Sequence, residues 1–192
     1  MKTIIGIDVG GSTTKIVGFR NEKIIAPQFV QATDPLTSLY GAFGKFTAEN
    51  GIELSDIEKV ILTGVGSSHV SKPLYGLACE TVSEFECVGR GGLFLSELSE
   101  AIVISMGTGT AIVHAKRDGY LNYLGGTGVG GGTLTGLSKK MLGIERIDHI
   151  VELAKDGSLD NVDLRIKDIS KKKSALSLPE NMTASNFGKL SD

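Results

Sequence analysis

One sequence pattern occurs twice in this chain of 192 residues: an apolar strand runs into a short turn of Gly, Ser and Thr, and a second apolar strand leaves it. The first copy spans residues 4–17 and the second spans residues 102–113. A turn of this kind directs backbone N–H groups and hydroxyls at one point, which suits a phosphate group. Two copies in one chain predict a phosphate grip on each side of a nucleoside triphosphate.

The charge balance of the chain argues against a polyanion as its partner. The formal net charge is −2, whereas a nucleic-acid-binding protein normally carries a basic stripe. The basic run at residues 171–173 is expected to be a solvated loop, because short charge runs usually face water. We therefore expect no nucleic-acid partner.

The cysteines and the N-terminal residues indicate the cellular compartment of the protein. Cys79 and Cys87 are the two cysteines of the chain and form no CxxC pair, and two scattered thiols in a chain of this length suggest a reducing compartment rather than a disulfide scaffold. The sequence begins directly with a predicted strand, without a signal-peptide core, and contains no apolar run long enough to span a membrane. The sequence predicts a cytoplasmic protein with no membrane partner.

The order of apolar patterns predicts a duplicated α/β architecture. In the first series, spacing of two or of three to four residues predicts strands at 4–7, 15–19, 23–26 and 59–63 and helices at 36–49 and 83–98. The second series has strands at 101–105, 110–115 and 120–123 and helices at 133–142 and 147–154. The order is βββαβα and then βββαα, which predicts domains at residues 1–100 and 101–192, the second truncated at its C-terminus.

The first turn carries groups suited to a metal-bound phosphate. Asp8 ends a strand, and a carboxylate there could hold Mg²⁺, which prefers oxygen ligands. Lys15 could neutralise a phosphate. The alternative is an ordinary hairpin with Asp and Gly as turn residues. The other predicted phosphate ligands of this turn are Gly10, Gly11, Ser12, Thr13 and Thr14.

The second turn and a glycine-rich segment at 125–133 extend the predicted phosphate site. The segment precedes an apolar helix, and helix N-termini attract anions. A flexible linker is the alternative, although a linker does not usually open a helix directly. The predicted phosphate ligands here are Thr108, Gly109, Thr110, Gly130, Gly131, Gly132 and Thr133.

Glu84 permits two interpretations from local sequence. Residues 81–84 have the T-x-x-E form of a capping box, in which Glu84 would accept a backbone hydrogen bond. Alternatively, Glu84 is a general base that accepts the proton of an alcohol during phosphoryl transfer. Arg90 on the same predicted helix could orient an acidic substrate, but a solvated surface position is the favoured interpretation.

Taken together, these motifs resemble the actin/hexokinase/Hsp70 superfamily and, within it, the type II pantothenate kinases. Residues 8–15 are similar to that family's D-x-G-G-[ST]-x-x-K loop, and residues 83–87 to the segment whose first Glu is the catalytic base. Residues 107–110 and 125–133 resemble its second phosphate loop and glycine-rich loop. The resemblance implies an actin-like fold, ATP and Mg²⁺ as cofactors, a homodimer, and phosphorylation of pantothenate with Glu84 as base, the first step towards coenzyme A.

Three departures from the family pattern concern the acceptor and the length. Ala111 stands where the family usually has Ser, and Tyr123 where it has an Arg that pairs with the pantothenate carboxylate. Gly125 and Gly126 lie beside them and complete the predicted acceptor site. Family members also continue beyond this C-terminus with segments that line the adenosine side of the cleft. Pantothenate or a related alcohol remains open as the acceptor.

Two other classes of function remain open. One is a different enzyme of the same superfamily, either a sugar kinase or the ATPase activator of a 2-hydroxyacyl-CoA dehydratase. The activators need cysteines that bridge an iron–sulfur cluster, for which Cys79 and Cys87 are candidates. The other is a nucleotide-binding module without catalytic activity.

Overall fold

The structure is a computed structural model that describes residues 2–11, 13–21, 23–31, 34–70, 72–170 and 178–190. Ser12, a predicted phosphate ligand, and the basic run at 171–173 lie outside the described residues. The chain divides into two compact units, residues 1–130 and residues 131–192. The predicted division at residue 100 concerns the repeated pattern and stays a prediction.

The first sheet places several strand ends at one edge. Its strand order is β3-β2-β1-β4-β5, with β1 antiparallel to β2 and parallel to β4, and β4 parallel to β5. Parallel strands end at the same edge of a sheet, so whatever follows β1, β4 and β5 begins there. The strands are β1 (Thr3–Val9), β2 (Thr13–Arg20), β3 (Lys23–Gln31), β4 (Ile57–Thr63) and β5 (Cys79–Thr81).

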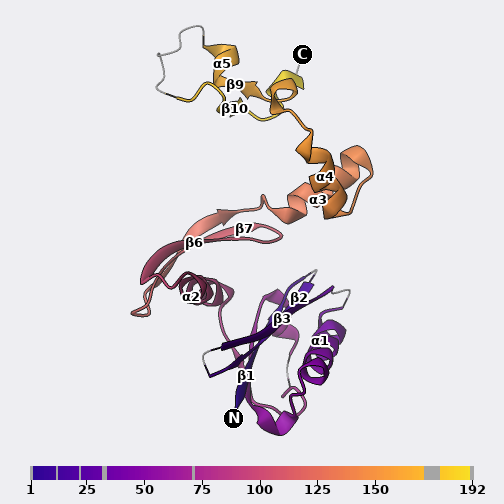
Figure 1. Ribbon diagram of the computed structural model, residues 1–192, viewed down its shortest axis with the longest axis vertical. Helices are drawn as coiled ribbons and strands as arrows, with labels where there is room; N and C mark the ends of the chain where they lie inside the picture. The colour runs from indigo at the N-terminus through magenta and orange to yellow at the C-terminus, as the bar shows by residue number, and fades with distance from the viewer. Residues whose placement is uncertain are drawn as a thin grey trace. The chain divides into compact units, whose positions relative to one another are not determined.

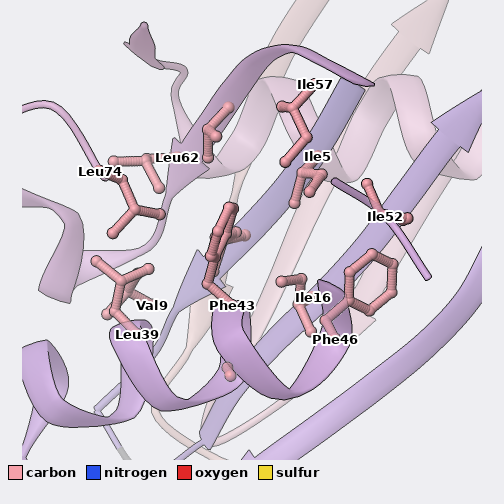
Figure 2. Packing of buried hydrophobic residues seen from close by; sticks show 13 residues of the cluster. Ile5, Val9, Ile16, Leu39, Phe43, Phe46, Ile52, Ile57, Leu62 and Leu74 are labelled. Atoms are coloured by element: carbon pink, nitrogen blue, oxygen red, sulfur yellow. The ribbon is translucent and has the colours of Figure 1, made fainter. Parts of the chain in front are cut away.

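Helix α1 (Pro35–Glu49) covers one face of this sheet and closes its core (Figure 1). Strand β1 alternates between buried and half-buried residues, as expected for a strand with one face in the core. Figure 2 shows Phe43 and Phe46 of α1 packed among the apolar side chains of the strands, and both rings are fully buried. Asp34 caps the helix by accepting a hydrogen bond from the Thr37 N–H at 2.7 Å.

The second sheet has the order β6-β7-β8 and carries helix α2 (Glu84–Ser96) on one face (Figure 1). A Cβ at Gly89 would lie 2.8 Å from the Leu121 side chain, and one at Gly92 would lie 2.6 Å from Val103. These glycines therefore let α2 approach the sheet closely, which explains why a helix tolerates them. The strands are β6 (Glu100–Met106), β7 (Thr110–Lys116) and β8 (Leu121–Thr127).

The second unit holds two helices and a small C-terminal substructure. Helices α3 (Gly131–Leu142) and α4 (Ile147–Lys155) contact each other. Beyond them the buried Asp163 carboxylate accepts hydrogen bonds from the Thr183 hydroxyl and the Phe187 N–H. Asp163 thus joins two segments that lie about 20 residues apart. The remaining elements are β9 (Leu164–Arg165), α5 (Ile166–Ile169) and β10 (Thr183–Ser185).

The predicted order of strands and helices is confirmed through residue 155, with differences in detail. Strand β5 was not predicted, because three exposed residues carry no apolar pattern. Strand β3 continues to Gln31 and β8 to Thr127, beyond their predicted ends. Among the described residues, none of the helices combines the length and apolar character that crossing a membrane requires.

Candidate functional site

The first turn is closed by its own backbone. The Gly10 N–H donates to the Thr13 carbonyl at 3.2 Å. A Cβ at Gly10 would lie 2.6 Å from that oxygen, so a side chain does not fit there. Gly11 has open space around it, which leaves the outer side of the turn accessible to a ligand.

A row of polar side chains crosses the sheet beside this turn. Asp8 lies opposite Lys15 on β2 and beside Thr63 on β4. The Lys15 ammonium lies 2.6 Å from the Asp8 carboxylate, and the two side chains are 51% and 25% exposed. Asp8, the predicted metal ligand, and Lys15, the predicted phosphate-binding cation, therefore form an ion pair at the edge of the sheet.

Thr14 does not reach the surface of the turn. It follows the alternation of β2 onto the face that packs against α1, where it is fully buried. Its hydroxyl has no hydrogen-bond partner among the described residues. This burial argues against the prediction that Thr14 donates its hydroxyl to a phosphate, whereas half-buried Thr13 lies on the opposite face.

Glu84 begins α2 at the same edge of the sheet. The Val82 N–H donates to the Leu62 carbonyl of β4 at 2.9 Å, and the helix starts two residues later. The capping-box interpretation is wrong, because Ser83 and not Thr81 occupies the N-cap position and makes no side-chain cap hydrogen bond. Glu84 is the first residue of the helix and is not used as a cap, which removes the structural competitor to the general-base interpretation.

The Cys87 thiol lies near several carboxylates whose charges affect its pKa. Burial raises the pKa of its thiol above the ordinary value, and the nearby Thr63 side chain opposes this. The negative charges of Glu86, Asp8 and Glu84 raise the pKa of the thiol further. Asp8 and Glu84 therefore both lie within electrostatic range of one half-buried thiol, although they come from β1 and α2.

The second turn packs against the segment that follows β8. The Gly107 N–H donates to the Gly109 carbonyl at 2.8 Å, and the Thr110 hydroxyl donates to the Val129 carbonyl at 2.8 Å. A Cβ at Gly130 would lie 2.7 to 2.9 Å from backbone atoms of residues 107–109. The structure thus brings predicted residues Thr108, Gly109, Thr110 and Gly130 together.

Replacing Gly130 by Ala is expected to distort the second turn, because the obstructing atoms belong to the backbone and cannot rotate away. Overpacking lowers the stability of a fold by about 1–3 kcal/mol. If the distorted turn loses about 1.4 kcal/mol of binding free energy, nucleotide affinity falls about 10-fold. Titration with a fluorescent ATP analogue measures the change. Gly128→Ala is the matched control, because a Cβ at Gly128 meets nothing within 4 Å. Equal affinity of the two variants would contradict the proposed contact.

The glycine-rich segment is divided among three structures rather than forming one loop. Residues 125–127 complete β8, where Gly126 pairs with Ala111 and a Cβ would lie 2.4 Å from the Thr110 carbonyl. Residues 128–130 pack on the second turn. Gly131, Gly132 and Thr133 form the first turn of α3 in the second unit, and their phosphate contact stays a prediction.

Tyr123 connects β8 to the start of α2. Its ring stacks on Phe85 with centroids 4.1 Å apart and planes inclined by 22°. Its hydroxyl lies 2.9 Å from the position that a Cβ would take at Gly126. The predicted acceptor residues Ala111, Tyr123 and Gly126 therefore lie together, and Phe85 places them beside Glu84.

A cavity of about 310 Å³ opens next to this aromatic pair. This volume falls at the lower end of the range for small-molecule sites, about 300–1,000 Å³. Sequence reasoning gave no role at this site to Phe85 or Thr63, and it considered Cys87 only as a candidate iron–sulfur ligand. The position of Thr63 at the end of β4, parallel to β1, was a usable signal for that residue. The residues that line the cavity include Ser83, Phe85, Glu86, Arg90, Leu121 and Tyr123.

Solved structures share this architecture. Component A of the (R)-2-hydroxyglutaryl-CoA dehydratase of Acidaminococcus fermentans matches with a TM-score of 0.62 and 20% identity, over 82% of this chain and 60% of that chain. The ethanolamine utilization protein EutJ of Carboxydothermus hydrogenoformans matches with a TM-score of 0.55 and 15% identity, over 81% and 62%. Likenesses at such identities show the fold alone, and they confirm the predicted actin-like α/β fold.

Curated relatives give the family. A type II pantothenate kinase of Bacillus cereus is 32% identical over 203 residues, which cover 98% of this chain and 67% of the relative. The type II pantothenate kinase of Oceanobacillus iheyensis is 29% identical over 196 residues, covering 97% and 66%. The chain thus spans about two thirds of the length of these relatives. The Fumble family matches residues 97–192. With these matches and the fold, the chain belongs to the type II pantothenate kinase family.

Proposed function

We propose that the protein transfers the γ-phosphoryl group of ATP to the primary hydroxyl of pantothenate, the first step towards coenzyme A. The observation that carries this proposal is that Asp8, at the end of β1 opposite Thr63, and Glu84, at the start of α2 after β5, lie at the same edge of the first sheet. The names of the curated relatives support pantothenate as the acceptor. A solved neighbour with bound ADPNP, the activator of the 2-hydroxyisocaproyl-CoA dehydratase of Clostridium difficile, supports nucleotide use (TM-score 0.56, 20% identity, 92% of this chain and 60% of that chain).

In this proposal Glu84 accepts the proton of the acceptor hydroxyl as its oxygen attacks the γ-phosphorus. The new O–P bond forms, the bond to the β-phosphate bridging oxygen breaks, and ADP leaves. Positioning and charge neutralisation supply most of the rate in phosphoryl transfer. The backbone N–H group of Gly11, the Lys15 ammonium, and the second turn at 107–110 would hold the phosphates, whereas the Gly10 N–H is engaged by the Thr13 carbonyl.

Mg²⁺ fits the groups present at the first turn. Within the described part of the chain, no cluster of three or more His, Cys, Asp or Glu side chains could cage a metal. Mg²⁺ needs no such cage, because it usually keeps several waters and takes one or two carboxylates together with substrate phosphates. The Asp8 carboxylate, 25% exposed and beside the phosphate turn, would supply such a ligand. When bound, the ion would neutralise charge on the phosphates.

The proposal extends to assembly and compartment, namely a homodimer in the cytoplasm. Both follow from the resemblance to the family, and two cysteines in a chain of 192 residues agree with a reducing compartment. Light scattering coupled to size-exclusion chromatography tests the dimer: a molar mass of one chain would refute it.

A coupled assay of ADP release tests the activity. The purified protein is given ATP and Mg²⁺ with pantothenate, pantetheine or common sugars in parallel reactions. We expect ADP release that depends on pantothenate. Release with a sugar but not with pantothenate would assign the protein to another acceptor. Nucleotide binding without release in the presence of any acceptor would indicate a binding module.

A further inference from the structure

We infer that Thr63 is a positioning residue, whose hydroxyl donates a hydrogen bond to the Asp8 carboxylate when the Lys15 ammonium turns to a phosphate. This inference rests on the proposed function, because it concerns the metal ligand of the same site. Thr63 is the last residue of β4, and the parallel register pairs it with Asp8 of β1.

The side chains of Thr63 and Asp8 lie next to each other on one face of the first sheet. Paired residues of neighbouring strands share a face, and the strands are about 4.7–4.9 Å apart. Leu62 points into the core under α1 (Figure 2), so Thr63, the next residue, lies on the opposite face. Rotation of the two side chains is therefore enough to join the hydroxyl to the carboxylate.

The two oxygens of the Asp8 carboxylate face the two strands that flank β1. Oδ2 accepts a hydrogen bond from the Lys15 ammonium of β2 at 2.6 Å. A Cβ at Gly64, the residue after Thr63, would collide with Oδ1. Gly64 also has a φ of +83°, a conformation that suits glycine. The glycine thus lets Oδ1 approach the end of β4, beside the Thr63 hydroxyl.

The Thr63 hydroxyl is buried and has no hydrogen-bond partner among the described residues. The residue is 9% exposed, so bulk water does not replace a partner. The Cys87 side chain lies near this hydroxyl, and a thiol is a weak hydrogen-bonding group. Buried hydroxyls in native proteins are usually paired, because an unpaired one destabilises the fold. The Asp8 carboxylate is the neighbouring acceptor that can pair with it.

Lys15 determines whether Asp8 needs this second donor. Its side chain is 51% exposed, so it can leave Asp8 and neutralise a phosphate. A hydrogen bond from Thr63 then keeps the Asp8 carboxylate ionised and fixes its orientation, because hydrogen bonding to the charged form favours that form. Carboxylates that bind metals are commonly hydrogen-bonded in this way, and loss of the partner typically lowers metal affinity about 10- to 100-fold.

Binding of Mn²⁺ in the presence of a non-hydrolysable ATP analogue, followed by electron paramagnetic resonance, tests this inference. Thr63→Val removes the hydroxyl and nearly keeps the shape of the side chain, whereas Thr63→Ser keeps the hydroxyl. We expect the Mn²⁺ dissociation constant to rise about 10-fold in the Val variant and to stay within about threefold in the Ser variant. In an Asp8→Asn background, Thr63→Val should add less than about twofold, because it acts through Asp8.

Thermal stability separates positioning from a structural role. Without metal and nucleotide, the melting temperature of Thr63→Val should not fall, because the unpaired hydroxyl contributes no hydrogen bond there. Thr47→Val is the control: Thr47 lies on α1, its hydroxyl donates to the Phe43 carbonyl at 3.0 Å, and Mn²⁺ affinity should be unchanged.

Three results would overturn the inference while ADP release by the unsubstituted protein leaves the proposed function standing. They are an unchanged Mn²⁺ dissociation constant in Thr63→Val, an equal rise in the Val and Ser variants, and a lowered melting temperature of Thr63→Val. If the unsubstituted protein neither binds Mn²⁺ with the nucleotide nor releases ADP, the proposed function is wrong and the inference falls with it.

Discussion

Replacing Glu84 by Gln is expected to lower kcat for pantothenate phosphorylation by about 10²- to 10⁴-fold, the usual contribution of a positioned general base. The amide keeps the size of the side chain but cannot accept the proton of the acceptor hydroxyl. Because Glu84 makes no cap hydrogen bond at the start of α2, the fold should lose little stability. Coupled ADP release measures kcat, and titration with an ATP analogue should give an unchanged dissociation constant.

Glu58→Gln provides the matched control for this substitution. Glu58 is an exposed residue of β4 with no role in the proposed site, so turnover should stay at the unsubstituted rate. A Glu84→Gln variant that turned over as fast as this control would falsify the base assignment. Loss of nucleotide binding in Glu84→Gln would instead place Glu84 in the nucleotide site.

Replacing Asp8 by Asn is expected to lower turnover by about 10²- to 10³-fold, in the range seen when one electrostatic partner of a transition state is removed. The amide still offers an oxygen, but it no longer carries the negative charge that favours Mg²⁺. The Lys15 ammonium also loses its ionic partner at 2.6 Å. Titration of activity against Mg²⁺ should show half-maximal rate at a higher Mg²⁺ concentration than in the unsubstituted protein.

A second ion pair of the same sheet separates this effect from the loss of a salt bridge. Lys59 on β4 and Glu80 on β5 pair at 2.8 Å, and both are at least as exposed as Asp8. Glu80→Gln should leave turnover and its Mg²⁺ dependence unchanged. If Asp8→Asn lowered turnover without shifting the Mg²⁺ dependence, Asp8 would act through Lys15 rather than through the metal.

The sequence predicted the order of elements well because most of them carry a strong apolar period. The fully buried residues Phe43 and Phe46 mark α1, and the alternation of β1 places Ile5 and Ile7 in the core. Strand β5 was not predicted because its residues carry no apolar pattern. It forms through parallel pairing with β4, a contact between segments distant in sequence.

The sequence named candidate residues of the two turns, but it could not give their arrangement. The turn residues were found from glycine and hydroxyl patterns, yet the burial of Thr14 depends on which face of β2 packs against α1. The position of Tyr123 also escaped prediction, because nothing in the local sequence shows that this residue of β8 stacks on Phe85 of α2. The burial of Thr14 and the position of Tyr123 both depend on contacts between residues distant in sequence, which local sequence preferences do not show.

Glycines at positions 89 and 92 let α2 lie directly on the strands β6 to β8. Glu84 is consequently carried by the second sheet, whereas Asp8 belongs to the first. Val82 and Ser83 form the link between β5 and the helix. The proposed base and the proposed metal ligand therefore belong to different sheets. A change in the backbone angles of Val82 and Ser83 would alter the distance between the two carboxylates.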